Sequence, residues 1–231
     1  SVTTAKNKPA DQDYILYVGS LEPRKNIRSL VEAYERLRER NPKIRSKLIL
    51  IGGESPLFGE VRLNAKNFKD DVIFKGFVED PELRDYYRQA TLVVYPSLYE
   101  GFGLPPLEAM ASGTPVVTSN TSSIPEVVGN AALMVNPYDT EQLADTMEMV
   151  ICNDEIRHTL IEKGLAHVQR YNWYRVARNT LAIYYEVYNT IERGRYTRSQ
   201  FIPFNVWQKL KKIEALKSSR KLELLSETYS Y

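Results

Sequence analysis

Short apolar runs that alternate with helix-like stretches are the feature that most restricts the fold of this 231-residue chain. The runs are almost continuously apolar, which is typical of parallel strands buried on both faces of a sheet. Strand and helix signals that alternate in this way predict an α/β fold, a doubly wound parallel sheet with helices on both faces. We expect the strands at residues 14–18, 47–51, 72–74, 91–95, 115–118 and 132–135.

Apolar residues at helical spacing fill the stretches between these runs. Asp80 followed by Pro81 predicts a helix start, with Asp80 as the N-cap and Pro81 at the first helical position. Asp139 with Gln142 resembles a capping box that opens another helix. From about residue 154 to 193 the pattern is helical throughout. The helix expected between the first two strands has its apolar residues at Ile27, Leu30, Val31, Tyr34 and Leu37.

Three parts of the chain differ in composition. Residues 1–13 are polar and lack periodicity, which predicts a linker, whereas residues 14–192 contain the strands and helices of one α/β domain with helices at its carboxyl end. Residues 193–231 form a basic tail or linker, since residues 193–221 hold nine Lys or Arg and a single acid. The tail is expected to be partly helical, with one apolar stripe at Trp207, Leu210, Ile213 and Leu216.

Overall composition excludes several classes of protein. A net charge of +2 gives no support for a nucleic-acid partner. The single cysteine, Cys152, excludes an internal disulfide and a cysteine zinc cluster, and it is compatible with a reducing compartment. No apolar run approaches the ~18–20 residues that a membrane-spanning helix needs. We therefore expect a cytoplasmic globular protein.

Ligands of an open parallel sheet bind beyond the carboxyl ends of its strands, so the loops at these ends are the candidate sites. The loop GSLEPRKNI (19–27) places Arg24 and Lys25 just before a helix, where two cations and free backbone N–H groups fit a phosphate or diphosphate. Two solvated charges are the alternative, although cations in a first helical turn would oppose the helix dipole. The loop GFVED (76–80) offers an apolar surface to a ligand or is an ordinary turn.

The most distinctive loop is YEGFGLPPLEAM (99–110), in which seven residues separate Glu100 from Glu108. Two carboxylates around such a loop could be an acid/base pair, a metal site or unrelated surface charges. Prolines at the helix start place Glu108 about one turn inside the helix, with free backbone N–H groups at Gly103 and Leu104. A carboxylate accepts hydrogen bonds only, so it suits sugar or ribose hydroxyls better than phosphate. The alternatives are dipole complementation by Glu108 and a solvated charge at Glu100.

Two further patterns carry little chemical information. The triplet Asp11-Gln12-Asp13 matches the acidic DxD pattern of metal-dependent sugar transferases, but it precedes every predicted strand. His158 and His167 lie in late helical stretches, away from the strand-end loops. We interpret the triplet as a chance match, and the histidines as surface or core residues and not as catalytic bases.

Four segments, in the same order, together resemble the C-terminal domain of the retaining GT-B glycosyltransferases of family 4: VGSLEPRKNI, GFV, PSLYEGFGLPPLEAMASGTPVV and SSIPEVVGNAALMVNP. The resemblance covers roughly residues 14–185, and its E-x7-E block is specific. It implies a Rossmann-like domain, the C-terminal half of a GT-B fold. In that family this domain binds the nucleotide-sugar donor, and the acceptor enters the cleft between two domains.

The resemblance also implies roles for individual residues. Arg24 and Lys25 match the cations that bind the donor diphosphate, Glu100 matches the glutamate that contacts sugar hydroxyls, and Glu108 matches the one that binds the ribose. Many members carry arginine where this chain has Ser20, which leaves more of the diphosphate charge to Arg24 and Lys25. We therefore expect Arg24, Lys25 and Glu100 to be catalytic. The expected substrate-binding residues are Gly19, Ser20, Gly76, Phe77, Val78, Gly101, Phe102, Gly103, Leu104 and Glu108.

The implied activity is transfer of a hexose, with retention of anomeric configuration, from a nucleotide-diphosphate sugar to a glycan or lipid-linked glycan. We favour GDP-mannose over UDP-glucose or another UDP-hexose as donor. No metal or other cofactor is expected, because side-chain cations would stabilise the leaving diphosphate.

The partner that the resemblance implies is an N-terminal GT-B domain, without which we expect little or no transfer. A binding module without turnover, an epimerase and a phosphorylase are the alternatives. The basic tail would pack against that domain, link to a further one or dock on an anionic membrane at its inner face.

Overall fold

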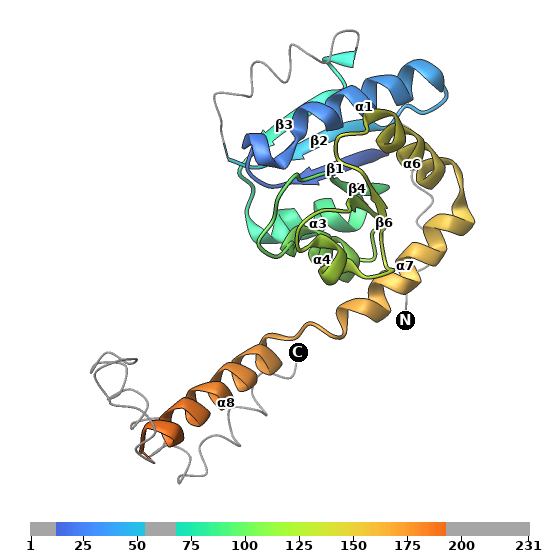
Figure 1. The fold of residues 1–231 in the computed structure, drawn as a ribbon. Coiled ribbons are helices and arrows are strands. Elements are labelled where there is room, and N and C mark those ends of the chain that lie inside the picture. Colours follow the sequence, from blue (N-terminus) through green and yellow to red (C-terminus); the bar gives the residue numbers. More distant parts are fainter. Residues whose placement is uncertain (1–12, 54–67, 193–231) are drawn as a thin grey trace. The chain divides into compact units, whose positions relative to one another are not determined.

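The structure, a computed structural model, describes residues 13–53 and 68–192. Within these ranges six strands form one parallel sheet, in the order β3-β2-β1-β4-β5-β6 (Figure 1). All six predicted strands are confirmed, with ends that shift by at most two residues. The strands are β1 (Tyr14–Val18), β2 (Lys47–Ile51), β3 (Val72–Gly76), β4 (Leu92–Tyr95), β5 (Val116–Ser119) and β6 (Leu133–Val135).

The strand order follows from the way the chain reverses direction across the sheet. β1 pairs in parallel with β2 on one side and with β4 on the other. The chain builds outward from β1 to β3, then returns to β4 and builds outward in the opposite direction. The loops after β1 and β4 therefore lie at the switch point, where open α/β sheets bind their ligands.

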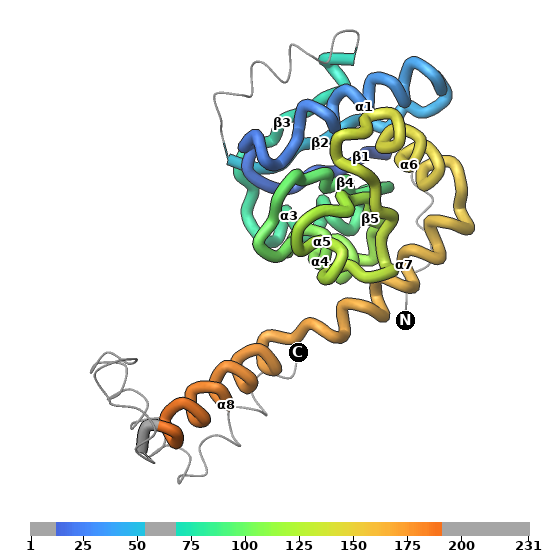
Figure 2. Tube along the Cα trace, viewed as in Figure 1, coloured from blue at the N-terminus to red at the C-terminus, as the bar shows by residue number. Residues whose placement is uncertain are grey.

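Helices cover both faces of the sheet, as the sequence predicts. On one face α1 packs against α6, and on the other α4 packs against α3, α5 and α7 (Figure 1). The tube view shows the short α5 beside α4 (Figure 2). The helices are α1 (Ile27–Arg40), α3 (Asp80–Gln89), α4 (Leu104–Ala111), α5 (Ile124–Val128), α6 (Thr140–Cys152) and α7 (Asp154–Val168), with a short 3₁₀ helix, η2 (Pro23–Lys25).

The sheet is buried between these layers, which explains its continuously apolar strands. Ile15 and Leu16 of β1 and Val93 and Val94 of β4 are completely buried. Side chains that point to opposite faces of a strand are thus covered on both sides, which is the pattern expected of a parallel sheet. The doubly wound, Rossmann-like fold is confirmed.

The carboxyl-terminal helices differ in part from the prediction. The chain divides into two compact units, the second of which begins at Tyr171. α7 ends at Val168 and α8 (Trp173–Glu192) begins after a break, so the prediction of an uninterrupted helical pattern is wrong at residues 169–172. α8 supplies the predicted helical extension. None of the described helices is long and apolar enough to cross a membrane.

Several predictions concern residues outside the described ranges. They are the linker at 1–12, the first two residues of the Asp11-Gln12-Asp13 triplet, and the tail at 193–231 with its apolar stripe. The assignment of residues 14–192 to one nucleotide-sugar-binding domain stays a prediction.

Two helix starts also differ in detail from the prediction. The N-cap of α3 is Glu79, so Asp80 and Pro81 are its first two residues and Asp80 does not cap it. At α6 the Asp139 carboxylate accepts a hydrogen bond from the Gln142 backbone N–H at 2.9 Å, as in a capping box. The Gln142 side chain does not return to Asp139, because its oxygen accepts from the Asn136 N–H at 2.8 Å.

Asn26 joins three of the strand-end loops. Its backbone is left-handed (φ 58°) between η2 and α1, a conformation that asparagine tolerates better than most residues. Its side-chain amide donates to the Pro96 carbonyl at 3.1 Å and to the Pro137 carbonyl at 2.7 Å. The loops after β1, β4 and β6 are thereby held together beneath the switch point.

We expect the Asn26→Gly variant to lose about 1–3 kcal/mol of unfolding free energy, because it removes both interloop hydrogen bonds. Glycine keeps the left-handed backbone, so Asn26→Ala should lose about 1 kcal/mol more than Asn26→Gly. Urea unfolding of both variants measures these losses. An Asn26→Gly variant as stable as the wild type would contradict this role of the side chain.

Candidate active site

The loops that follow β1 and β4 meet through a buried ion pair. Lys25 ends η2, and its Nζ lies 2.5 Å from Glu100 Oε1 in the loop after β4. Both side chains are only 8% exposed. The backbone reinforces this contact, since the Leu98 N–H donates to the Arg24 carbonyl at 2.8 Å. The structure thus brings together Lys25 and Glu100, which lie 75 residues apart in the sequence.

Tyr95, the last residue of β4, completes a triangle with this pair. Its hydroxyl accepts a hydrogen bond from Lys25 Nζ at 2.7 Å and donates one to Glu100 Oε1 at 2.8 Å. Burial opposes the ionisation of Glu100, but hydrogen bonds from Lys25 and Tyr95 outweigh it and lower the pKa of this carboxyl. Glu100 is therefore an anion at neutral pH and a hydrogen-bond acceptor.

Arg24 lies at the exposed edge of the same cluster. Its Nε donates to Glu22 Oε2 at 2.7 Å, and its Nη1 lies 3.3 Å from Glu100 Oε2. Hydrogen bonding and charge from Glu22 raise the pKa of Arg24. Among the described residues no acceptor contacts Nη2, so this end of the guanidinium is available to an anionic ligand.

Arg24 and Lys25 lie just before α1, as the sequence predicts. They belong to the last turn of η2, and α1 begins at Ile27, so the alternative that placed them in its first turn does not hold. Near the carboxyl end of a short helix, cations complement the dipole and do not oppose it. The left-handed Asn26 separates the two helices and makes this arrangement possible.

The start of α4 has free backbone donors, as predicted. Gly103 is the N-cap, with φ 115°, and no side chain caps this end. Pro105 and Pro106 lack N–H groups, so Gly103 and Leu104 carry the remaining free donors of the first turn. A side chain at position 103 would collide with Ile124, since its Cβ would lie 2.7 Å from Ile124 Cδ1. Phe102 is exposed (45%), and Gly101 is also exposed.

Glu108 lies on the exposed side of α4 and has a different partner from Glu100. Its Oε2 accepts a hydrogen bond from the Tyr87 hydroxyl of α3 at 2.8 Å. Among the described residues no donor contacts Oε1, which leaves that oxygen available to a ligand hydroxyl. The two glutamates are thus separately held acceptors, consistent with separate ligand groups.

The remaining predicted binding residues lie in the loops after β1 and β3. Ser20 is partly exposed, and its hydroxyl donates to Glu22 at 2.9 Å. Gly76, the last residue of β3, has a left-handed backbone (φ 68°). With residues of β2, of β3 and of the loops after β1 and β2, it lines a cavity of about 220 Å³. Phe77 is largely exposed (77%), whereas Val78 packs in the core, so only the backbone of Val78 could reach a ligand. Gly19, partly exposed, follows β1 directly.

Sequence reasoning missed two groups of residues around the glutamates. Three buried tyrosines, Tyr17, Tyr95 and Tyr87, each donate to a group of the site loops: the Ser20 carbonyl, Glu100 and Glu108. Their apolar rings read as core positions, and nothing in their spacing reveals where the hydroxyls point.

The second group lies in the segment after β5. The Ser122 hydroxyl accepts from the Glu100 N–H at 2.9 Å, and the Ser123 hydroxyl donates to the Glu100 and Phe102 carbonyls, both at 2.9 Å. The run of hydroxyl residues in SNTSS (119–123), directly after a strand, was the available signal.

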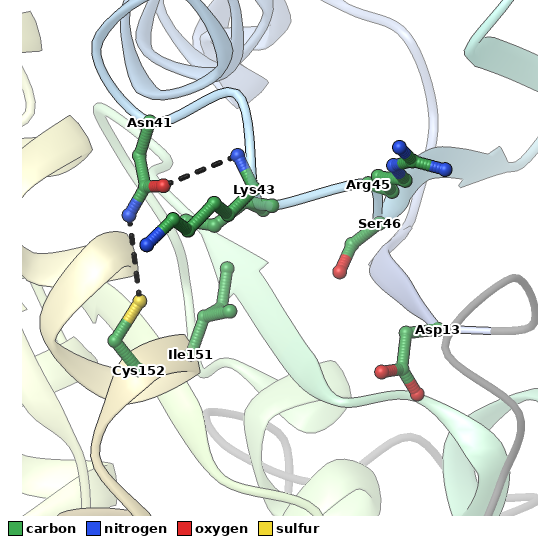
Figure 3. Close-up of a pocket in the computed structure, with 8 residues that line it drawn as sticks. Asp13, Asn41, Lys43, Arg45, Ser46, Ile151 and Cys152 are labelled. Carbon is green, nitrogen blue, oxygen red and sulfur yellow. Dashed lines mark hydrogen bonds between the residues drawn. The ribbon is translucent and has the colours of Figure 1, made fainter.

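A larger cavity, of about 440 Å³, lies near the amino ends of β1 and β2, opposite the strand-end loops (Figure 3). It is lined by Asp13, next to the start of β1, and by Lys43, Arg45 and Ser46, next to the start of β2. Because ligands of such sheets bind at the carboxyl ends of the strands, we do not assign the active site to this cavity.

The two histidines lie away from the strand-end loops. His158 is an exposed residue of α7, and His167 is buried with its Nε2 2.7 Å from the Val127 carbonyl. Within residues 13–53 and 68–192, no three His, Cys, Asp or Glu side chains are grouped so that they could hold a metal ion.

Comparison with curated proteins finds mannosyltransferases among the relatives. The O-antigen chain mannosyltransferase B of Escherichia coli is 37% identical over 193 residues, 78% of this chain and 47% of that protein. The serotype-specific mannosyltransferase WbdA of Escherichia coli is 29% identical over 219 residues, 92% of this chain and 26% of that protein. The chain thus spans half or less of the length of these two relatives.

Solved structures support the same relationship. Sucrose-phosphate synthase from Thermosynechococcus elongatus superposes with a TM-score of 0.68 at 32% identity, over 80% of this chain and 47% of that one. The C-terminal domain of a glycosyl transferase group 1 family protein (LpcC) from Francisella tularensis has a TM-score of 0.60 at 27% identity, over 68% of this chain and 85% of that one. The family model named Glycosyl transferases group 1 matches residues 3–167. The chain therefore belongs to the glycosyl transferases group 1 family.

Proposed function

We propose that this chain is the donor-binding half of a retaining GT-B glycosyltransferase of family 4, and that it transfers a hexose from a nucleotide-diphosphate sugar. The observation that carries the proposal is the cluster of Arg24, Lys25 and Glu100 at the switch point. It combines two cations with an ionised carboxylate beside the uncapped start of α4. That combination suits a ligand with an anionic part and a hydroxyl-bearing part.

The anionic part of the donor is its diphosphate. Lys25 Nζ uses two of its three hydrogens on Tyr95 and Glu100, and Arg24 has an unused Nη2. Together with the N–H groups of Gly103 and Leu104, these donors would stabilise negative charge on the departing nucleoside diphosphate. Because the side chains supply this charge, we expect no metal to be required.

The hydroxyl-bearing parts are the transferred sugar and the ribose. Glu100 is almost fully occupied by protein donors, so it would accept one further hydrogen bond, from a sugar hydroxyl. Glu108 is exposed, and among the described residues no donor contacts its Oε1, which suits the ribose hydroxyls. The cavity beside Gly76 would take part of the base.

Mannose is the sugar that we favour, with GDP-mannose as donor, because two relatives are named mannosyltransferases. The acceptor would be a glycan or a lipid-linked glycan, in keeping with the O-antigen chain in the name of one relative. Both relatives are longer than this chain, so we expect transfer to require a second domain that holds the acceptor.

The first experiment measures the thermal unfolding of the 231-residue chain with GDP, UDP, ADP and their sugar conjugates. A ligand at 100 times its dissociation constant adds about 2.7 kcal/mol of stability, so a true donor raises the melting temperature clearly. We expect the largest effect from GDP-mannose, and no change when EDTA removes divalent ions. A chain that none of these compounds stabilises would contradict the proposed function.

The second experiment separates the roles of the glutamates by calorimetry. Glu108→Gln should weaken binding of the nucleoside diphosphate by about 1.5–3 kcal/mol, since it removes a charged hydrogen-bond acceptor. Glu100→Gln should remove the additional affinity of the sugar-bearing form, and it should weaken nucleoside diphosphate binding less than Glu108→Gln does. Glu126→Gln, in the exposed first turn of α5, is the matched control. Equal effects of both substitutions on the nucleoside diphosphate would refute this division.

A further inference from the structure

The two glutamates share a structural feature that lies outside their sequence motif, a hydrogen bond from a buried tyrosine. Each carboxylate accepts a hydrogen bond of 2.8 Å from the hydroxyl of a buried tyrosine, Tyr95 at Glu100 and Tyr87 at Glu108. Tyr95 is 1% exposed and Tyr87 is 2% exposed. The tyrosines come from different elements, the end of β4 and the last turn of α3.

The rigid surroundings of Tyr87 make it an effective anchor. Its ring is enclosed in the core, and its backbone carbonyl accepts a hydrogen bond from Thr114 Oγ1 at 2.5 Å. Glu108, in contrast, is exposed on α4 and would otherwise sample several rotamers. Since Tyr87 occupies Oε2, the hydrogen bond restricts the rotamers of Glu108 and leaves Oε1 available to a ligand.

Tyr95 is fixed in the same way. Its ring stacks on Tyr17 with centroids 5.9 Å apart and planes 14° apart, and its carbonyl accepts from Thr118 Oγ1 at 2.7 Å. Its hydroxyl contacts both Lys25 and Glu100, so it sets the distance of both charged groups from β4.

Both hydroxyls are permanent donors over the working range of pH. Burial is the main cause that raises the pKa of Tyr95 and of Tyr87, and the adjacent carboxylates raise both further. Neither phenol ionises beside its glutamate, so both remain hydrogen-bond donors.

We propose that Tyr87 and Tyr95 are positioning residues, of which Tyr87 sets recognition of the ribose through Glu108 and Tyr95 sets recognition of the transferred sugar through Glu100. The proposal rests on the proposed function, because it assigns each tyrosine the ligand group of its glutamate. It predicts that loss of one phenol oxygen in the core changes selectivity between ligands and not merely stability.

The test of Tyr87 uses the Tyr87→Phe variant of the 231-residue chain. The ligand is GDP or UDP, whichever the wild type binds more tightly. We expect affinity to fall about tenfold, since a charge-assisted hydrogen bond orients the acceptor. Discrimination against the 2′-deoxy and 3′-deoxy analogues should decrease in the variant. In a Glu108→Gln background, Tyr87→Phe should have no further effect on affinity.

The test of Tyr95 uses Tyr95→Phe and the same nucleoside diphosphate, with and without its sugar. The affinity gained from the sugar should fall about tenfold. The sugar-free form should lose less affinity than the sugar-bearing form, because Lys25 keeps its contact with Glu100. The opposite pattern, weaker sugar-free binding with the sugar advantage retained, would refute the role of Tyr95.

Tyr14→Phe is the matched control for both variants. Tyr14 is also a buried tyrosine packed against α3, and its hydroxyl donates to the Tyr86 carbonyl at 2.8 Å, away from the glutamates. Urea unfolding of the three variants shows whether each is folded under the binding conditions. We expect Tyr14→Phe to bind all ligands as the wild type does.

The outcomes separate the two levels of inference. Two results would overturn the positioning role and leave the proposed function intact, provided that the wild type binds GDP or UDP. In the first, Tyr87→Phe discriminates against the deoxy analogues as strongly as the wild type does. In the second, Tyr14→Phe and Tyr87→Phe change the affinity equally. A wild-type chain that binds neither GDP nor UDP overturns both.

Discussion

The buried contact between Lys25 and Glu100 is the interaction on which the rest of the site depends. Removing two charged groups from water costs several kcal/mol per ion, so such a pair persists only with good geometry and further hydrogen bonds. Tyr95 and Arg24 supply those bonds. Because each buried charge is stabilised by the other, separation of the loops after β1 and β4 would leave an unpaired charge in the core.

Contacts within the protein hold the loops of the candidate site in place. The hydroxyl groups of Thr121, Ser122 and Ser123 hold the loop around Glu100 from one side, and Asn26 holds it from the other. Fixed donors and charges act on a developing anion without the cost of reorganising them during the reaction. The same rigidity would let two carboxylates recognise different hydroxyl groups of one ligand.

Much of the fold could be predicted from the sequence because its signals are local. Continuous apolar runs identified the six strands, and Leu104-Pro105-Pro106 marked the start of α4. The errors occurred where a local sequence pattern was compatible with more than one local structure. Asp80 was predicted as a cap, but the preceding residue takes that place, and residues 169–172 interrupt a helical pattern that looked continuous.

For the candidate site, sequence reasoning proposed the charged and glycine residues but missed their contacts and the surrounding tyrosines and serines. The sequence by itself determined which charged and flexible residues lie at the carboxyl ends of the strands, because strand periodicity and turn residues act over a few positions. Only the tertiary structure decided that Lys25 lies against Glu100, that Val78 is buried, and that Tyr95 and Tyr87 direct their hydroxyls to the glutamates. These contacts join residues from separate strands and helices. Their geometry is fixed by the packing of the whole sheet, which no short stretch of sequence determines.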